Sequence, residues 1–230
     1  MMTDSRYRET LNSRREIGFP ADRNLWRESP AEFDNTAGLL KILGHPVMER
    51  WEEPYMRSLA RIATSRGGSV LEVGFGLGLS AAFIQQGVIT KHVIIEANRD
   101  VYQNALRFAR TARLETIVYE GFWQDVVAHL ADESFDGILF DTYPMTLDEV
   151  HCQHYWFFKQ ACRLLKEGGV FTYCSDEAES FSSAHRQALH EAGFQDESIA
   201  FEICRVDPPT DCEYWKAKTF LAPTITKVQF

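Results

Sequence analysis

The stretch LEVGFGLG, residues 71–78, ends an apolar segment and then places glycine at every second position. Gly74, Gly76 and Gly78 allow the backbone to turn tightly and to approach a ligand closely, because glycine has no Cβ. The helix-like segment LSAAFIQQ (79–86) follows directly. A strand, a glycine-rich turn and a helix in this order are typical of the first unit of a nucleotide-binding sheet. A plain strand-to-helix turn would also use glycine, so the interpretation depends on the rest of the chain.

Apolar segments with strand character alternate with amphipathic segments along the chain. We expect strands at 69–74, 92–98, 116–121, 135–141 and 170–175, and two more in the tail within 199–209 and 219–228. We expect helices at 79–86, 101–111, about 148–166 and 183–193, and two helices between about 35 and 65. The alternation predicts an α/β, Rossmann-like fold: a doubly wound, mostly parallel seven-stranded sheet with helices on both faces.

The N-terminal residues differ from the rest of the chain because they are mostly polar. We expect residues 1–35 to form an arm that is mobile or folds over the active site, and residues 36–230 to form a single domain. Trp26 is unusual in such an arm. Closure over a bound ligand would explain it.

Composition limits the classes of partner. The chain has 230 residues, of which 45% are hydrophobic and 13% aromatic, as expected for a globular protein with a substantial core. Its net charge of −9 gives no broad basic surface, so we expect no nucleic-acid partner. No apolar run approaches the roughly 20 residues of a membrane span, and the first residues lack the hydrophobic region of a signal peptide. We therefore expect a cytoplasmic protein with no membrane partner.

The cysteines and histidines give no metal site. The five cysteines are scattered without a CxxC pair, which favours free thiols. His151 and His154 form an HxxH pair, but no third ligand is evident, so we expect no metal. We assign no role to His185 and His190.

Two acidic residues add context to the glycine-rich turn. Glu72 precedes the glycines, and Glu96 ends the second strand. An acid at that position can accept hydrogen bonds from both ribose hydroxyls, in nicotinamide enzymes and in S-adenosylmethionine (SAM) methyltransferases alike. Residue 79 is leucine, so the turn lacks the G-x-G-x-x-G spacing of nicotinamide enzymes.

The fourth strand runs into the segment DGILFDTYP, residues 136–144, which places Asp141 at the carboxyl end of the strand. With the glycine-rich turn and Glu96, this segment resembles the class I SAM-dependent methyltransferases. The segments KILGHPVMERWEEPYM (41–56) and RLLKEGGVFTYC (163–174) narrow the resemblance to the guanidinoacetate N-methyltransferase family. It runs from about Trp26 to Cys174 and continues more loosely to the end.

The resemblance implies a guanidino N-methyltransferase that moves a methyl group from SAM to a small molecule and releases S-adenosylhomocysteine. It also implies which residues contact the cofactor. These are Trp26, Met48, Met56, Gly74, Phe75, Gly76, Leu77, Gly78, Leu79, Glu96, Ala97, Asn98, Phe122, Trp123 and Asp141. For Met48 and Met56, ordinary packing in a helix core is the alternative.

The resemblance also implies that Glu52 and Asp141 bind the substrate guanidinium and that Asp141 is the catalytic base. A guanidinium presents its N–H donors in a planar fork, and one carboxylate can accept two parallel hydrogen bonds from it. Pro144 would stiffen the segment, and Tyr143 would wall the pocket against water. A helix cap at Asp141 and a solvated helix face at Glu52 remain alternatives.

One segment departs from the family. Where the family has a neutral stretch whose backbone N–H groups hold the substrate carboxylate, this chain reads SDEAES, residues 175–180. Asp176 and Glu177 would attract an ammonium, so the substrate is free L-arginine or guanidinoacetate. Solvated acids at a helix start would explain the same residues. The expected substrate-binding residues are Trp26, Glu52, Asp141, Tyr143, Asp176 and Glu177.

Other functions fit the same pattern. The chain could methylate protein arginine or another small amine, or it could be a non-catalytic SAM-binding module. A homodimer through the N-terminal arm is also possible.

Overall fold

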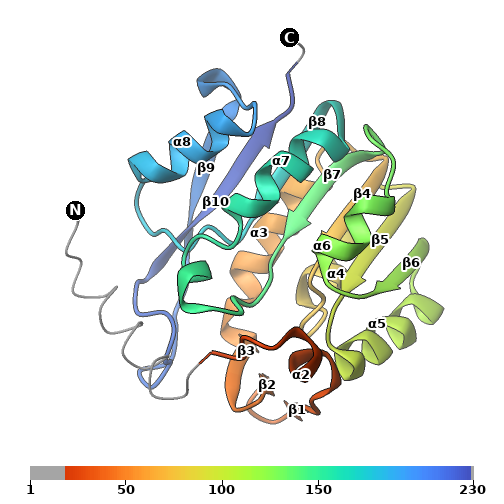
Figure 1. Cartoon of the computed structure of the whole chain (residues 1–230), viewed down its shortest axis with the longest axis vertical. Coiled ribbons are helices and arrows are strands. Elements are labelled where there is room, and N and C mark those ends of the chain that lie inside the picture. The colour runs from red at the N-terminus through yellow and green to blue at the C-terminus, as the bar shows by residue number, and fades with distance from the viewer. Residues whose placement is uncertain (1–18, 229–230) are drawn as a thin grey trace.

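The computed structural model describes residues 19–228, and its centre is one seven-stranded sheet (Figure 1). The strand order is β6-β5-β4-β7-β8-β10-β9. The strands are β4 (Ser69–Val73), β5 (Lys91–Glu96), β6 (Glu115–Glu120), β7 (Phe135–Phe140), β8 (Leu165–Tyr173), β9 (Ile199–Arg205) and β10 (Thr219–Thr226). All neighbours from β6 to β8 pair in parallel, and β10 pairs antiparallel with β8 and with β9. The predicted fold class is confirmed.

Helices cover both faces of the sheet (Figure 1). They are α3 (Glu53–Ala63), α4 (Leu79–Ile84), α5 (Arg99–Thr111), α6 (Trp123–Val126), α7 (Tyr155–Leu164) and α8 (Ser183–Glu191). Val70 packs with α3 and α4, whereas Leu71 and Val73 belong to the core cluster of α7 and α8. Both faces of β4 are therefore buried, which is why its apolar residues Val70, Leu71 and Val73 do not alternate with exposed ones, and even Glu72 is buried.

The expected helix between residue 35 and the GHP segment is wrong. Residues 39–49 form a hairpin of β2 (Leu39–Ile42) and β3 (His45–Glu49), which pairs with β1 (Ala31–Asp34) in a separate three-stranded sheet. Leu43 and Gly44 both have positive φ, as a two-residue hairpin turn requires. Leu39, Leu40 and Leu43 have helical spacing by coincidence, because Leu43 lies in the turn.

Other boundaries also differ from the sequence prediction. The expected helix at 148–166 is the short 3₁₀ helix η3 (Leu147–Glu149) followed by α7. Strand β8 begins at Leu165, so the Lys166–Gly169 segment lies within the strand, where its register with β7 shifts. The second helix expected before residue 65 is present as α3, preceded by the 3₁₀ helix η1 (Arg50–Glu52).

The predicted N-terminal arm lies partly outside the described residues, since these begin at residue 19. Within the described part, Arg23–Glu28 form helix α2, capped by Asp22, and β1 follows. Asn98 donates hydrogen bonds to the carbonyls of Trp26 (2.9 Å) and Ser29 (2.8 Å), which ties α2 to the main domain. In the part of the chain described, no helix is both long and apolar enough to span a bilayer.

The turn after β4 depends on the absence of a side chain at Gly74. This residue has φ +91°, and a Cβ there would lie 1.9 Å from the carbonyl oxygen of Asp141. Gly168 has φ +73° but open space around it. Both glycines have a positive φ, but only at Gly74 would a Cβ collide with another part of the backbone.

We predict that Gly168→Ala lowers the free energy of unfolding by about 1–2 kcal/mol, the cost of placing alanine at positive φ. Gly74→Ala should cost about 1–3 kcal/mol more, because β4 and β7 must separate. Urea denaturation of both variants measures the difference. Equal losses would show that Asp141 does not fix the turn.

Candidate active site

A pocket lies at the carboxyl ends of β4, β5 and β7, beneath the small β1–β3 sheet. Val73, Ile95 and Asp141 line it from the main sheet, and Leu40 and Met48 line it from the hairpin. In an open parallel sheet this edge is where ligands bind. The hairpin therefore forms the wall of the pocket opposite the edge of the main sheet.

Part of the pocket lining combines small residues with aromatic ones. Gly74, Gly76 and Ala97 give it a wall with little side-chain bulk, and Phe122 and Trp123 give it aromatic surface. All five are residues predicted to contact the cofactor.

Glu96 also lines this part of the pocket, and its carboxylate is tightly held. It accepts hydrogen bonds from the backbone N–H groups of Phe75 (2.9 Å) and Asn98 (2.8 Å). Burial raises its pKa, and the backbone hydrogen bonds oppose that change. A carboxylate fixed in this way can accept further hydrogen bonds from a ligand hydroxyl.

Several predicted cofactor residues lie outside the pocket lining. Met56 is fully buried in the core of α3, and the ring of Phe75 packs against Phe108 at 5.6 Å between centroids. Asn98 caps α5 through its Oδ1. The predicted residues outside the lining are Met56, Phe75, Leu77, Gly78, Leu79 and Asn98. Residues 75 and 77–79 form the turn and the start of α4, Asn98 anchors α2, and Met56 packs in the core.

Glu52 lies at the start of α3 and is buried, with 6% of its surface exposed. The backbone N–H of Glu49 (2.7 Å) and the hydroxyl of Tyr214 (2.6 Å) both donate to its Oε1. Within residues 19–228 no donor bonds to its Oε2, which leaves that oxygen for a ligand. Burial and then the nearby Asp141 charge raise the pKa of Glu52 to about 8.

Asp141 follows the last residue of β7, and its backbone N–H donates to the Val73 carbonyl (2.9 Å). Burial, then the charges of Asp176 and Glu72, raise the pKa of its carboxyl to about 7. Among the described residues, no arginine or lysine forms an ion pair with Asp141 or Glu52, and none lines the pocket. The pocket therefore holds two carboxyl groups to which residues 19–228 give no cationic partner.

Trp26 and Tyr143 cover the pocket as a stacked pair. Their ring centroids are 5.0 Å apart with an interplanar angle of 16°. The Tyr143 hydroxyl lies 3.1 Å from Nδ1 of His45 on β3, so the pair joins α2, the hairpin and the segment after β7. Both residues line the pocket.

Two of the three acids in the SDEAES segment were predicted to bind substrate, and they have different positions. Asp176 lines the pocket, whereas Glu177 does not. Of the HxxH pair, His151 lies 3.4 Å from Asp176, and His154 is fully buried among aromatic rings. No group of three His, Cys, Asp or Glu side chains in the described part of the chain is arranged to hold a metal ion.

Sequence reasoning missed several polar residues of the pocket, among them Tyr214 and Gln153. Tyr214 bonds to Glu52 from 162 positions away, in the segment between β9 and β10. Gln153 lies between η3 and α7. Neither belongs to a local motif, so only the folded arrangement reveals them.

Similarity to known families covers nearly the whole chain. The family model described as guanidinoacetate N-methyltransferase matches residues 20–228. A protein arginine N-methyltransferase 2 of Eremothecium gossypii is 33% identical over 160 residues, which is 66% of this chain and 38% of that protein. A protein of the same name from Aspergillus oryzae is 26% identical over 227 residues, 93% of this chain and 54% of that protein. The chain thus spans about half or less of the length of these relatives.

Among solved structures, spermidine synthase from Thermotoga maritima superposes with a TM-score of 0.61 and 16% sequence identity. The superposition covers 86% of this chain and 68% of the spermidine synthase chain. At this identity the likeness concerns the fold alone.

The two raised carboxyl pKa values make the stability of the ligand-free protein depend on pH. Between pH 4.5 and about 8, Glu52 is protonated in the folded chain but ionised in the unfolded chain. The folded state then binds more protons, so the free energy of unfolding falls as pH rises through this window.

We predict that Glu52→Gln, which keeps an acceptor oxygen for Tyr214 and Glu49, is more stable than the parent protein at pH 8. The gain should be about 4 kcal/mol, because the pKa of Glu52 is raised from 4.5 to about 8 and each pKa unit is worth about 1.4 kcal/mol, and it should vanish at pH 4. Glu53→Gln on the surface is the control and should change stability by less than about 0.5 kcal/mol at either pH. Chemical denaturation at the two pH values measures this, and a pH-independent effect of Glu52→Gln would contradict it.

Proposed function

The chain belongs to the guanidinoacetate N-methyltransferase family, and from this premise we propose that it transfers a methyl group from SAM to a guanidino nitrogen of a small molecule. One observation carries the proposal. Glu52 and Asp141 line one pocket, both have raised pKa values, and the described residues give neither a cationic partner. A cationic ligand that donates several hydrogen bonds stabilises their ionised forms, and a guanidinium is such a ligand.

The residues at the other end of the pocket fit SAM. Gly74 and Gly76 leave room for a ligand close to the backbone, Glu96 offers an acceptor for ribose hydroxyls, and Trp123 and Phe122 offer a surface for the adenine. Bound there, SAM supplies an activated methyl group on its sulfonium. S-adenosylhomocysteine is the expected product.

Glu52 and Asp141 then have distinct roles. Glu52 is held by Tyr214 and the Glu49 N–H, so its position is fixed and it orients the guanidinium plane. The carboxylate of Asp141 takes a proton from the guanidino nitrogen as that nitrogen forms its bond to the methyl carbon. Burial raises the pKa of Asp141, so its carboxylate accepts a proton more readily than that of a solvent-exposed aspartate.

The Trp26–Tyr143 pair supports a small substrate. The stacked rings cover the pocket, with 5% of the Trp26 surface exposed, and exclude water from the reacting groups. Guanidinoacetate and L-arginine are both small enough to be enclosed. Placement of the nitrogen close to the methyl carbon is the main contribution the protein makes to the rate.

A second candidate function is methylation of arginine in a protein. It is favoured by the relatives named protein arginine N-methyltransferase 2. A protein substrate would present the same guanidinium to Glu52 and Asp141, but it would require the cover of Trp26 and Tyr143 to admit a polypeptide. Methylation of an arginine-containing protein at a rate above that of free arginine would favour this second function.

Three further features belong to the proposal as predictions from sequence. These are a cytoplasmic location, the absence of nucleic-acid and membrane partners, and a possible homodimer. Gel filtration with light scattering would test the last.

We predict that Asp141→Asn lowers kcat/KM for S-adenosylhomocysteine formation by about 100-fold or more, because general base catalysis contributes that much. SAM binding, measured by calorimetry, should change by less than fivefold. Asp148→Asn, an exposed acid nearby, is the matched control and should retain full activity.

The substrates to compare are guanidinoacetate, L-arginine, agmatine and an arginine-containing protein. Full activity of Asp141→Asn would exclude Asp141 as the base, and SAM binding without turnover of any of the four would favour a non-catalytic SAM-binding module.

A further inference from the structure

The pocket extends beyond the two carboxyls that bind the guanidinium, and a third acid lines it. Asp176 lies in the loop after β8, and 16% of its side chain is exposed. Its charge contributes to the raised pKa of Asp141, so the two carboxyls are electrostatically close. A substrate that Asp141 holds in this pocket therefore also experiences the charge of Asp176.

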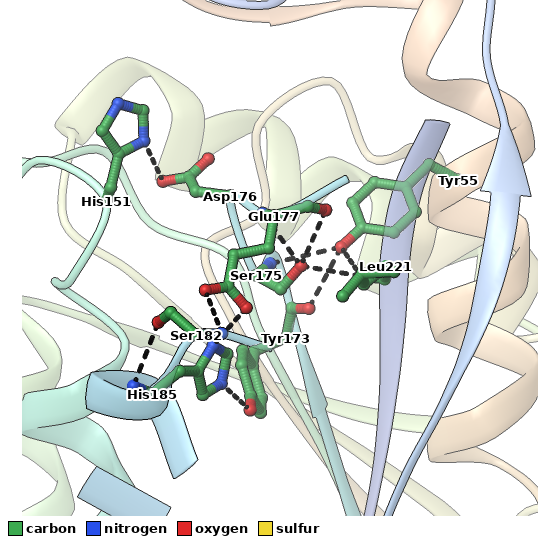
Figure 2. A network of polar contacts seen from close by, with 9 residues as sticks. All are labelled: Tyr55, His151, Tyr173, Ser175, Asp176, Glu177, Ser182, His185 and Leu221. Atoms are coloured by element: carbon green, nitrogen blue, oxygen red, sulfur yellow. Dashed lines mark hydrogen bonds and ion pairs between the residues drawn. The ribbon is translucent and has the colours of Figure 1, made fainter. Parts of the chain in front are cut away.

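The backbone on either side of Asp176 is firmly anchored (Figure 2). Ser175 is fully buried, its Oγ donates to the Leu221 carbonyl (2.8 Å), and its backbone N–H donates to the Tyr55 hydroxyl (3.2 Å). The backbone carbonyl of Glu177 accepts from the N–H of Leu221 (2.8 Å). Asp176 is thus held in place by its neighbours, with φ +53°.

Both carboxylate oxygens of Glu177 have partners within the protein. Its Oε1 accepts from the Ser182 N–H (2.9 Å), and its Oε2 lies 2.9 Å from Nδ1 of His185. Nε2 of His185 in turn lies 2.5 Å from the Tyr173 hydroxyl. Figure 2 shows the Glu177 carboxylate turned towards this group and the Asp176 carboxylate turned towards His151. Glu177 is therefore unavailable to a ligand.

Asp176 keeps capacity for a ligand. His151 lies 3.4 Å from its Oδ2. The Cys174 thiol, a weak donor, contacts its Oδ1 at 4.0 Å. Two carboxylate oxygens offer about four acceptor positions, so these long contacts leave room for a ligand donor.

Gln153 supplies a second acceptor in the pocket. It is buried, with 9% of its surface exposed, and its Nε2 donates to the Thr142 carbonyl (3.4 Å), which sets the orientation of the amide. Its Oε1 has no hydrogen-bond partner in the described part of the chain. A buried acceptor without a donor is costly unless a ligand or water supplies one.

Charge favours a cation at this end of the pocket. A guanidinium carries one positive charge, whereas Glu52, Asp141 and Asp176 together carry three negative charges when ionised. The pocket lining contains no lysine or arginine in residues 19–228. A substrate carboxylate beside Asp176 would be repelled, whereas an ammonium would add a charge of the right sign and three N–H donors.

We propose that Asp176 and the Oε1 of Gln153 form a second subsite that binds a protonated amine. The preferred substrate then carries a guanidinium at one end and an ammonium at the other, as free arginine and agmatine do. The inference rests on the proposed function. Asp176 determines specificity and takes no part in methyl transfer.

The test compares Asp176→Asn with Glu179→Gln, which removes the same charge from an exposed position in the same segment. Four compounds are used: agmatine, L-arginine, guanidinoacetate, and butylguanidine, which is agmatine without its amine. KM and kcat are measured for each, together with calorimetric binding in the presence of S-adenosylhomocysteine. In the parent protein, agmatine should bind at least tenfold more tightly than butylguanidine.

Asp176→Asn should raise KM for agmatine and arginine at least tenfold, leave butylguanidine within twofold, and lower KM for guanidinoacetate. Glu179→Gln should change none of these more than twofold. A purely structural role for Asp176 would weaken all four compounds together, and that result would overturn the inference, as would an unchanged preference for agmatine. If the parent protein neither methylates nor binds any of the four, the proposed function itself is wrong and the inference fails with it.

Discussion

The structure depends on one constraint: two carboxyl groups, Glu52 and Asp141, share a buried pocket without a cation from the described residues. Burial of like charges is unfavourable, and here it raises both pKa values towards neutrality. The protein maintains the arrangement from two directions. Strand β7 delivers Asp141 to the edge of the sheet, and the start of α3 delivers Glu52, which Tyr214 and the Glu49 N–H hold by hydrogen bonds. The stability lost in the empty pocket is available to a cationic ligand as binding free energy.

The other parts of the pocket surround Glu52 and Asp141. The β2–β3 hairpin and the stacked rings of Trp26 and Tyr143 line the pocket, and a cation enclosed by them would be attracted to the carboxylates more strongly than in water. At the other end of the pocket, the glycine-rich turn and Glu96 leave space and acceptors for a nucleoside. Asp176 lines the same pocket, and the second subsite that we propose there would favour a substrate with a second positive charge.

The sequence predicts the central sheet well because the parallel strands are buried on both faces and read as apolar runs between helices. Asp141 and Glu96 could be located because each directly follows or ends such a run. The hairpin was missed because Leu39, Leu40 and Leu43 imitate a helical period, and the positive φ of Leu43 is a tertiary requirement that leucine itself does not signal. Tyr214 and Gln153 were missed because their importance comes only from contacts made across the fold. Met56 and Asn98 were expected at the cofactor, but they lie in the core and at a helix cap.

Binding of a guanidinium should stabilise the ionised forms of Glu52 and Asp141, so these two carboxyl groups should release protons when it binds. The most direct measurement is titration calorimetry of methylguanidinium into the protein with S-adenosylhomocysteine at pH 7, in two buffers of different ionisation enthalpy. The account predicts a net release of protons to the buffer on binding, and a loss of most of that release in Glu52→Gln. Binding with no proton release, and with an affinity unchanged between pH 6 and pH 8.5, would show that the carboxyls are already ionised in the empty pocket and would contradict the account.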